Sequence, residues 1–495
     1  MNGNFPAITA FPVLTKLTQE FPQSKAYLVG GAVRDILLDK EVTDFDMLVT
    51  GIPSHELEAF LAKNGRVVFA GRNFGIWKFR EIGKPPAEVY DIALPRTEFS
   101  MHKQGLYRDF TVKTDHRLPV VEDLKRRDFT VNAMAYDLAA QKLIDPHNGQ
   151  RDLAQKIIKT VGSAAERFSE DYSRMLRAIR FSLQLGFEIE PETEKTLREM
   201  IPNINAFSEN RRVVPYEIIA EELLKSLKAN PPEAIRQWDR LGALTEIVPE
   251  LLQMKGCVQP ENWHTEGDVW PHVILALETL SSEAFRKEFG EHQPGMELIV
   301  AVLFHDIGKP YTITTPERDN SDRIRFNDHD VVGAKIAKRV LNRIRASAPP
   351  NVGINIDYVC WLVRYHMLLV HGDLEKMRPT TIEKYFFSTI YPSQDLIKLM
   401  FVDGLATVGP EGEGFTNNYE RLKAKMGHIK QQTGSHGIKL AKPLISGNDV
   451  MNLLLIPAGR RVGTILEEIR LKQLSGELGS RADALEFLNQ KKTSA

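Results

Sequence analysis

The sequence predicts an α+β protein, in which an α/β head is followed by helical segments that make up the rest of the chain. The head is indicated by residues 27–49, where an apolar run ends at Gly30 and Gly31, a helix-like segment follows, and a second apolar run completes the stretch. This order is typical of a strand, a glycine turn, a helix and a strand. Beyond about residue 150, helical spacing of apolar residues predicts an all-helical neck, body and tail.

The composition is that of a globular protein with several domains. The 495 residues suit two to four domains, and 42% hydrophobic and 26% charged residues are ordinary proportions. Two cysteines, Cys257 and Cys360, suit a reducing cytosol, and no apolar run approaches the ~20 residues of a membrane helix. The first residues also lack the pattern of a signal peptide, so we expect a cytoplasmic protein with no membrane segment. The net charge of −1 argues against a general nucleic-acid coat, although a local basic face can still bind RNA.

Further elements of the head follow along the chain. Helices are predicted at about residues 6–20 and 55–64, strands at residues 66–70, 75–79 and 89–94, and a mobile loop without clear period at residues 100–118.

Asp44 and Asp46 stand two residues apart on an extended segment, so their carboxylates share one face. Two such side chains suit one or two Mg²⁺ ions. Gly30 and Gly31 would let the backbone approach a phosphate closely, with a helix N-terminus behind it as an anion site. The alternative is an ordinary glycine turn beside a solvated acidic loop. Asp91, in the last predicted strand, is either a third metal ligand or a carboxylate with a local partner.

A mixed charged cluster at residues 122–128 opens a run that looks helical. Asp128 could cap this helix, with Arg126, Arg127 and Asn132 turned toward a ribose and a triphosphate. The alternative is a solvated helix start. A turn at residues 144–149, with proline and glycine, then predicts the hinge between the head and the neck.

Residues 167–181 are predicted as one helix, in which Asp171 and Arg174 would share a patch of surface. The sequence segments GGAVRD, DFD, RRDFT with NA, DP-x-x-G-x-x-DL and ED-x-x-R, in this order, resemble the family of tRNA CCA-adding enzymes and bacterial poly(A) polymerases. The resemblance implies a nucleotidyltransferase head of the polymerase β-like type. It also implies that Arg34 helps Gly30 and Gly31 to cradle a triphosphate.

The Asp171 and Arg174 pair suggests how a base could be chosen. A carboxylate only accepts hydrogen bonds and a guanidinium only donates them. Cytosine and adenine both offer an amino donor beside a ring-nitrogen acceptor, whereas uracil and guanine offer the reverse, so one pair could accept CTP and ATP and reject UTP and GTP. The alternative is a surface salt bridge worth only ~0.2–0.5 kcal/mol. Arg177 and Arg180 either contact phosphate or ribose or form a solvated stripe.

A second candidate site follows the apolar run that ends at residue 304. His305 and Asp306 resemble the paired ligands of HD-superfamily phosphohydrolases, and His272 and Asp403 fall where that fold needs its other ligands. This set suits a divalent transition metal or Mg²⁺. Three further side chains could line the same pocket, namely His329, His366 and, on a phosphate, Lys309.

The tail is predicted as a glycine-rich linker and then helices at residues 418–433, 448–455, 460–472 and 480–489, with the last six residues frayed. Arg460 and Arg461 begin one of these helices and could hold an RNA backbone. The alternative is a plain helical hairpin.

The resemblance implies an enzyme that adds or repairs the 3′-terminal CCA of tRNA from CTP and ATP with Mg²⁺. Its domains are expected at residues 1–150 (head), 151–250 (neck), 251–412 (HD-type body) and 413–495 (RNA-binding tail). A poly(A) polymerase of the same fold, and an HD phosphohydrolase whose head only binds RNA, are the alternatives. The sequence leaves the oligomeric state open.

Overall fold

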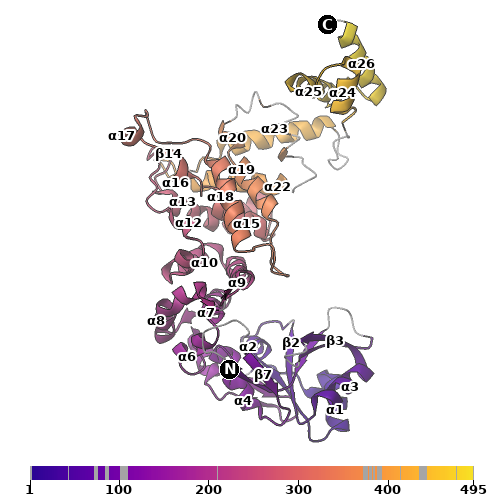
Figure 1. Cartoon of the computed structure of the whole chain (residues 1–495), viewed down its shortest axis with the longest axis vertical. Coiled ribbons are helices and arrows are strands. Elements are labelled where there is room, and N and C mark those ends of the chain that lie inside the picture. The colour runs from indigo at the N-terminus through magenta and orange to yellow at the C-terminus, as the bar shows by residue number, and fades with distance from the viewer. Residues whose placement is uncertain are drawn as a thin grey trace. The chain divides into compact units, whose positions relative to one another are not determined.

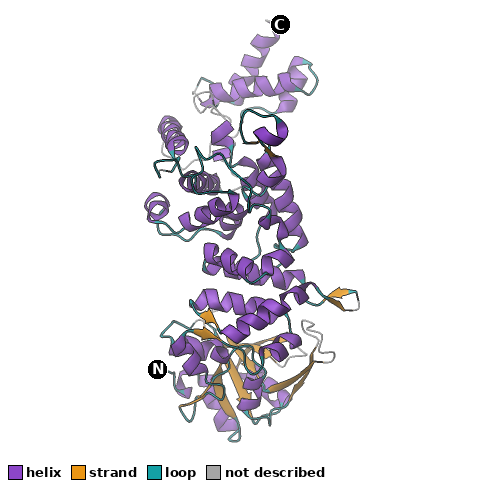
Figure 2. Cartoon of the chain, turned by 90° about the vertical axis from the view of Figure 1, so that its left-hand side faces the viewer, coloured by secondary structure: helices purple, strands orange, loops and turns teal. Residues whose placement is uncertain are grey.

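The computed structural model describes residues 3–42, 44–71, 76–83, 89–100, 110–208, 210–371, 377, 382, 385–386, 393–412, 414–433, 443–474 and 477–493. The chain divides into two compact units, one of residues 1–249 and 342–353 and the other of residues 250–341 and 354–495. The large sheet belongs to the first unit, and the second unit is almost entirely helical (Figures 1 and 2).

The head is built on a mixed sheet of seven strands in the order β3-β4-β5-β2-β1-β8-β9. Its central strand β2 pairs antiparallel with β1 and parallel with β5, and its inner residues are fully covered. The strands are β1 (Lys25–Val29), β2 (Phe45–Thr50), β3 (Gly65–Gly71), β4 (Ile76–Glu81), β5 (Tyr90–Ala93), β8 (Ala135–Asp137) and β9 (Lys142–Ile144). The predicted strands and the glycine turn of the head are therefore confirmed.

The head helices are η1 (Ile8–Ala10), α1 (Pro12–Glu20), α2 (Gly31–Leu37), α3 (Ser54–Asn64), α4 (Val120–Lys125) and η2 (Thr130–Asn132). The loop predicted at residues 100–118 is wrong in part, because β6 (Arg96–Ser100) pairs with β7 (Phe110–Thr114) as an antiparallel hairpin. Apolar and polar residues alternate along β7, which is typical of a strand, and the sequence interpretation overlooked this signal. Residues 101–109 lie outside the described residues.

The neck places α7 against α9, and both helices bury one apolar side. Its helices are α5 (Gly149–Gln155), α6 (Ala164–Glu170), α7 (Ser173–Leu185), α8 (Pro191–Met200), η3 (Ile201–Asn205), α9 (Tyr216–Ala229), α10 (Pro231–Arg240), α11 (Ala243–Ile247) and α12 (Pro249–Leu252). Two short strand pairs join them: β10 (Ile157–Ile158) with β11 (Glu188–Ile189), and β12 (Phe207–Ser208) with β13 (Arg211–Arg212). The neck is thus helical with small strand pairs rather than purely helical.

The second unit is organised around α15 (Met296–Phe304), whose last seven residues are all buried and which contacts α13, α19 and α22. A helix that is apolar on every side belongs in a protein core. The other elements are α13 (Val269–Thr279), α14 (Glu283–Phe289), α16 (Lys309–Thr312), β14 (Ile313–Thr314), α17 (Pro316–Asp319), β15 (Arg325–Phe326), α18 (His329–Arg343), α19 (Ile356–Tyr365), α20 (Leu368–His371), α22 (Ser393–Ala406) and α23 (Asn417–Thr433). None of the helices in the described ranges is both long enough and apolar enough to span a bilayer.

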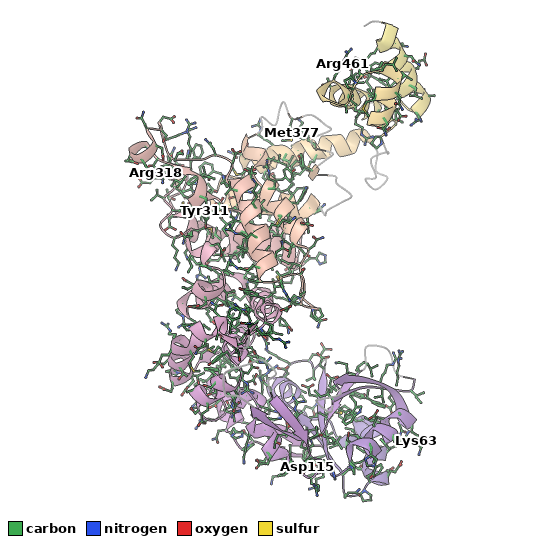
Figure 3. All side chains as sticks on the ribbon, viewed as in Figure 1. Lys63, Asp115, Tyr311, Arg318, Met377 and Arg461 are labelled. Carbon is green, nitrogen blue, oxygen red and sulfur yellow. The ribbon has the colours of Figure 1, made fainter. Side chains whose placement is uncertain are left out.

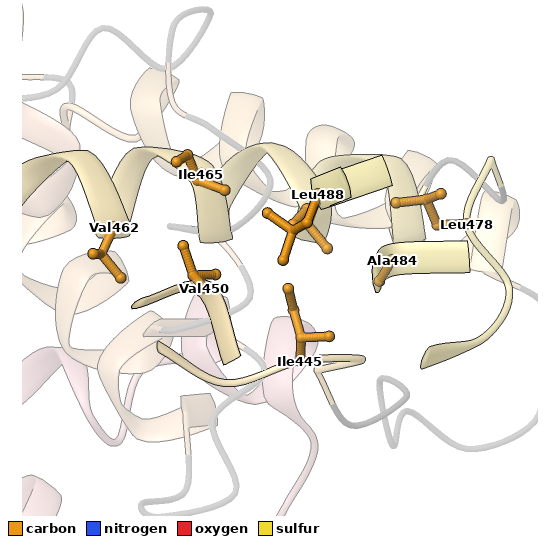
Figure 4. Close-up of a cluster of buried hydrophobic side chains, with 8 residues drawn as sticks. Ile445, Val450, Val462, Ile465, Leu478, Ala484 and Leu488 are labelled. Carbon is orange, nitrogen blue, oxygen red and sulfur yellow. The ribbon is translucent and has the colours of Figure 1, made fainter. Parts of the chain in front are cut away.

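The tail consists of α24 (Gly447–Leu454), α25 (Arg460–Leu474) and α26 (Arg481–Thr493) around a small apolar core of its own (Figure 4). Ser446 and Asp449 form a capping box that starts α24. Arg461 is exposed at the start of α25 (Figure 3). The predicted fraying is wrong for residues 490–493, which continue α26 because buried Ala484 and Leu488 hold that helix in the core.

Candidate active sites

A cavity of about 800 Å³ opens between the head sheet and the neck helices α7 and α9. Most of the side chains predicted to bind a nucleotide line it: Gly31, Arg34, Asp44, Asp46, Arg126, Arg127, Asp128, Asn132, Asp171, Arg174, Arg177 and Arg180. These residues span about 150 positions of the sequence, and the fold brings them to one place. Their roles with a bound nucleotide stay predictions.

Three carboxylates gather on one side of this cavity. Asp46 lies on β2 directly beside Asp91 on β5, Asp44 precedes β2, and all three line the cavity. Enclosure by the surrounding protein raises the pKa of Asp46, the carboxylates of Asp91 and Asp44 add to this rise, and Arg127 opposes it. Asp91 also has a local partner, since its carboxylate lies 2.9 Å from Lys78 Nζ. Oxygen ligands that repel one another in this way suit a hard divalent cation.

Gly30 ends β1 in a conformation that few other residues adopt, with φ at +69°. A Cβ atom at this position would lie 2.5 Å from a guanidinium nitrogen of Arg127. Glycine therefore leaves room for the Arg127 guanidinium group beside the turn, and Arg127 lines the cavity. Arg34, one turn into α2, donates to Asn132 Oδ1 at 2.7 Å, which joins two of the predicted phosphate and ribose contacts.

Buried carboxylates hold the arginines of the cavity in place. Asp123 is fully buried and lies 2.8 Å from a guanidinium nitrogen of Arg126 and 3.4 Å from one of Arg127. Glu222, on α9, accepts a hydrogen bond from Arg180 at 2.5 Å. The sequence interpretation missed both carboxylates, although the spacing of Asp123 from the two arginines on a short helix was a usable signal.

Asp128 does not cap a helix, which corrects the prediction for this segment. Phe129 is extended and bridges to Thr160, and the run that looked helical is the single 3₁₀ turn η2 leading into β8. The Asp128 carboxylate accepts instead from Arg177 at 2.6 and 2.9 Å. Burial alone would raise the pKa of Asp128, but the charge and hydrogen bonds of Arg177 lower it to about 2.

Replacing Asp128 with asparagine is expected to lower the free energy of unfolding by about 2 kcal/mol at pH 7, the equivalent of its pKa shift. Because the pKa of Asp128 is lower in the folded than in the unfolded chain, this stabilisation is present above about pH 5 and is lost as the pH falls toward 2. Urea unfolding at pH 7 and at about pH 2.5 measures the difference, because most of the stabilisation is lost only near the folded pKa. Asp39→Asn is the control, since Asp39 is exposed and its φ of 54° tolerates asparagine. A gap between parent and D128N that does not narrow at the lower pH contradicts this account.

Residues 167–181 form two helices and not the one predicted. α6 ends at Glu170, Asp171 is extended, and α7 begins at Ser173, whose backbone N–H donates to Asp171 Oδ1 at 2.8 Å. An acidic side chain that accepts from a helix N-terminus favours this break. Arg174 pairs with Glu170 and with the carbonyl of Arg167. The alternative to base recognition, a surface salt bridge between Asp171 and Arg174, is therefore not the contact that Arg174 makes.

Arg177 and Arg180 are not a solvated stripe, because Arg180 is buried against Glu222 and Arg177 is bound to Asp128. Both guanidinium groups also lie over the ring of Phe181. These contacts hold the two guanidinium groups in fixed positions in the lining of the cavity.

The second candidate site lies in the helical unit. His272 comes from α13, His305 and Asp306 follow α15, and Asp403 comes from α22. His272 Nε2 lies 3.1 Å from Asp403 Oδ1, and His305 Nε2 lies 3.3 Å from Asp306 Oδ2. The structure therefore brings the four predicted ligands together, as nitrogen and oxygen donors that fit a divalent metal.

Two further histidines and a lysine complete this cluster. His329, at the start of α18, and His366, directly after α19, lie 3.4 and 3.9 Å from Asp306 Oδ1 through their Nε2 atoms. Lys309 Nζ lies 2.6 Å from Asp306 Oδ2 and donates to Gln259. Burial lowers the pKa of His305, but the carboxylates of Asp306 and Asp403 outweigh it and raise the pKa to about 10.

Three family models match the chain. They are the poly A polymerase head domain at residues 26–159, the probable RNA and SrmB-binding site of polymerase A at residues 186–254, and the HD domain at residues 280–389. His272 and Asp403 lie outside the last range, so their inclusion in the second site rests on the geometry.

The multifunctional CCA protein of Neisseria gonorrhoeae is 34% identical over 347 residues, which cover 70% of this chain and 75% of that protein. The multifunctional CCA protein of Xanthomonas campestris is 38% identical over 299 residues, which cover 59% of this chain and 65% of that protein. A crystal structure of the Bacillus stearothermophilus CCA-adding enzyme in complex with CTP matches with a TM-score of 0.60 at 22% identity, over 99% of this chain and 98% of that one. The Thermotoga maritima CCA-adding enzyme complexed with tRNA matches with a TM-score of 0.54 at 21% identity, over 98% and 95%.

The head sheet and the carboxylates on its central strands therefore define a nucleotidyltransferase with a polymerase β-like head, and its second unit carries an HD domain. Domains of both kinds use divalent metals. The identity to the Neisseria protein, and the share of both chains that it covers, establish the family. The chain belongs to the multifunctional CCA proteins, which are tRNA nucleotidyltransferases.

Proposed function

We propose that the head cavity transfers cytidylyl and adenylyl groups from CTP and ATP to the 3′ end of tRNA and so builds or repairs the terminal CCA. The observation that carries this proposal is the single cavity that joins the carboxylates of β2 and β5 to the side chains of the neck. The solved structures of similar proteins, one with CTP and one with tRNA, support this choice of substrates.

In this proposal Asp44 and Asp46 hold Mg²⁺, with Asp91 beside them. Mg²⁺ bound there favours ionisation of the attacking 3′-hydroxyl and offsets charge on the α-phosphate. Arg34, Arg126 and Arg127 bind the triphosphate and orient it for in-line displacement of pyrophosphate. Gly30 and Gly31 let the chain approach the phosphates closely.

The neck side of the cavity reads the base and holds the sugar. Asp171 accepts from the amino group of cytosine or adenine, and Arg174 donates to the ring nitrogen beside it. Asp128 and Asn132 contact the ribose, and Asp128 also keeps Arg177 in place. Arg180 stays bound to Glu222 and adds positive charge toward the triphosphate.

We further propose that this division of labour follows four domains, at residues 1–150, 151–250, 251–412 and 413–495. The head would perform the chemistry, the neck would choose the base, and the tail, with Arg460 and Arg461 at the start of α25, would hold the tRNA backbone.

Incubation of the purified full chain with tRNA that lacks its 3′ end tests the proposal against its two rivals. CTP alone should give one or two added nucleotides, and CTP with ATP should give CCA and then stop. A poly(A) polymerase would make long A tracts with ATP alone, and a phosphohydrolase that only binds RNA would add nothing.

We also propose that the HD domain hydrolyses phosphate esters with a divalent ion held by His272, His305, Asp306 and Asp403. Lys309, buried beside Asp306, would bind a phosphate oxygen of the substrate.

Replacing Asp306 with asparagine is expected to lower metal-dependent phosphatase activity by more than about 100-fold and to leave CCA addition intact. Hydrolysis of a chromogenic phosphate ester with Mg²⁺, Mn²⁺, Co²⁺ or Ni²⁺ measures the first activity. Asp322→Asn, an exposed carboxylate of the same unit, is the matched control. Parent protein that is inactive with every divalent metal removes this part of the proposal.

A further inference from the structure

An aromatic side chain, Phe181 on α7, lies among the positively charged side chains of the head cavity. It is buried and contributes to the lining of that cavity. Three guanidinium groups lie over its ring, with the carbon atoms of Arg180, Arg177 and Arg34 at 4.1, 5.3 and 5.6 Å from the ring centroid. A cation within about 6 Å of the centroid is attracted to the electron-rich face of an aromatic ring. One ring is therefore the shared neighbour of three positive charges.

The ring is placed by the neck helix and by one residue of the head. Arg177 and Phe181 are four positions apart on α7, so they share one face of that helix. Arg34 comes from α2, the helix that follows the glycine turn of the head. Phe129 is fully buried and meets the Phe181 ring edge to face, with centroids 5.7 Å apart and ring planes at 75°. This contact orients the Phe181 ring between arginines of the head and of the neck.

The charge balance around the three guanidinium groups explains why an aromatic ring suits this position. Each arginine already has a carboxylate partner within 2.8 Å, namely Asp35 for Arg34, Asp128 for Arg177 and Glu222 for Arg180. A further carboxylate among them would compete with a bound triphosphate for the same N–H donors. The face of an aromatic ring carries no net charge, so it attracts the guanidinium groups and leaves their charge available to an anion. An aliphatic side chain would fill the space without this attraction.

We propose that Phe181 is a positioning residue for the triphosphate, because its ring holds these three arginines together in the arrangement that faces the phosphate oxygens. The inference rests on the proposed nucleotidyl transfer and adds to it a side chain that acts through the arginines. The triphosphate is common to CTP and ATP, so loss of the aromatic face should weaken the binding of both to the same extent. The choice of base depends on Asp171 and Arg174 and should not change.

Phe181→Leu and Phe181→Tyr in the full chain test the proposal. Leucine should weaken the binding of inorganic tripolyphosphate with Mg²⁺ about tenfold, measured by titration calorimetry, and should raise KM for CTP and ATP by the same factor. The preference for CTP over UTP should stay that of the parent, whereas a general collapse of the neck would lose it. Tyrosine keeps the aromatic face and should bind tripolyphosphate as the parent does. Phe187→Leu, an equally buried phenylalanine of the neck outside the lining of the head cavity, is the matched control.

A second measurement keeps the shape of the side chain. In a series of fluorinated phenylalanines at Phe181, the affinity for tripolyphosphate should fall with each added fluorine, because fluorine withdraws electrons from the face of the ring. An affinity that is constant across this series, or unchanged in the leucine variant, overturns the proposal.

These outcomes are separable from nucleotide addition itself. A parent protein that binds tripolyphosphate in a ring-dependent way but adds nothing to tRNA supports the positioning role and removes the proposed transfer. A parent protein that builds CCA, with a tripolyphosphate affinity that does not depend on the ring, does the reverse.

Discussion

Replacing Asp46 with asparagine should lower kcat/KM for nucleotide addition to tRNA by at least about 10³-fold, with little change in stability. Asparagine keeps the shape of the side chain but removes the negative charge that Asp46 shares with Asp44 and Asp91 around the proposed Mg²⁺ site. A metal that supplies several kcal/mol of transition-state stabilisation accounts for an effect of this size. Single-turnover addition of labelled CTP measures it.

The control for this experiment is Asp39→Asn, whose exposed carboxylate lies outside the cavity lining. It should add nucleotides at the parental rate. If D46N were to add CTP within tenfold of the parent at saturating Mg²⁺, the proposed metal site would be wrong.

The second large effect concerns which nucleotide is accepted. Asp171→Asn should reduce the preference for CTP over UTP, and for ATP over GTP, by about 100-fold. The correct bases lose a charge-assisted hydrogen bond worth ~1.5–3 kcal/mol. The asparagine amide can also donate to the carbonyl of uracil or guanine, which the aspartate rejected. The affinity for the triphosphate should change little, since the arginines that bind it remain. Competition between paired triphosphates on one tRNA measures the preference directly.

Arg174→Lys tests the other half of the pair, although Arg174 also bonds Glu170 and the carbonyl of Arg167. Its effect should appear in the same base preferences. Arg198→Ala, with 47% of its side chain exposed on α8, is the control and should preserve them. Unchanged selectivity in both variants, with rates alone reduced, would contradict base recognition by this pair.

The sequence predicts well those parts of the site that depend on residues close to one another along the chain. Asp44, Asp46 and the glycine turn follow from a strand, a turn and a strand within residues 27–49, and the structure has these elements where the pattern put them. The burial of α15 also follows from its own composition. Local periodicity is enough for such elements because each buries its apolar face in one direction.

The contacts that orient the arginines are different, since they join distant segments. Asp128 and Arg177 are 49 positions apart, and Arg180 and Glu222 are 42 apart. Nothing in the spacing of a single sequence assigns these partners. The break at Asp171 was missed for a related reason: helical periodicity continues across it, and only the capping contact to Ser173 reveals two helices.

The HD domain shows the same limit at a finer scale. Its histidines and aspartates could be gathered by resemblance, but the orientation of the His272, His305 and His329 rings is set by backbone carbonyls and by Glu266, which contact Nδ1. Glu266 lies six residues before His272 and also accepts from the backbone N–H of Val408. Those contacts exist only once the helices pack.

The most direct test of the central claim is the sequence of the tRNA 3′ ends made by the full chain from tRNA without CCA, with all four nucleoside triphosphates present in excess. The account predicts products that end in CCA and grow no further. Ends that carry runs of A, mixed nucleotides, or no addition at all would contradict it.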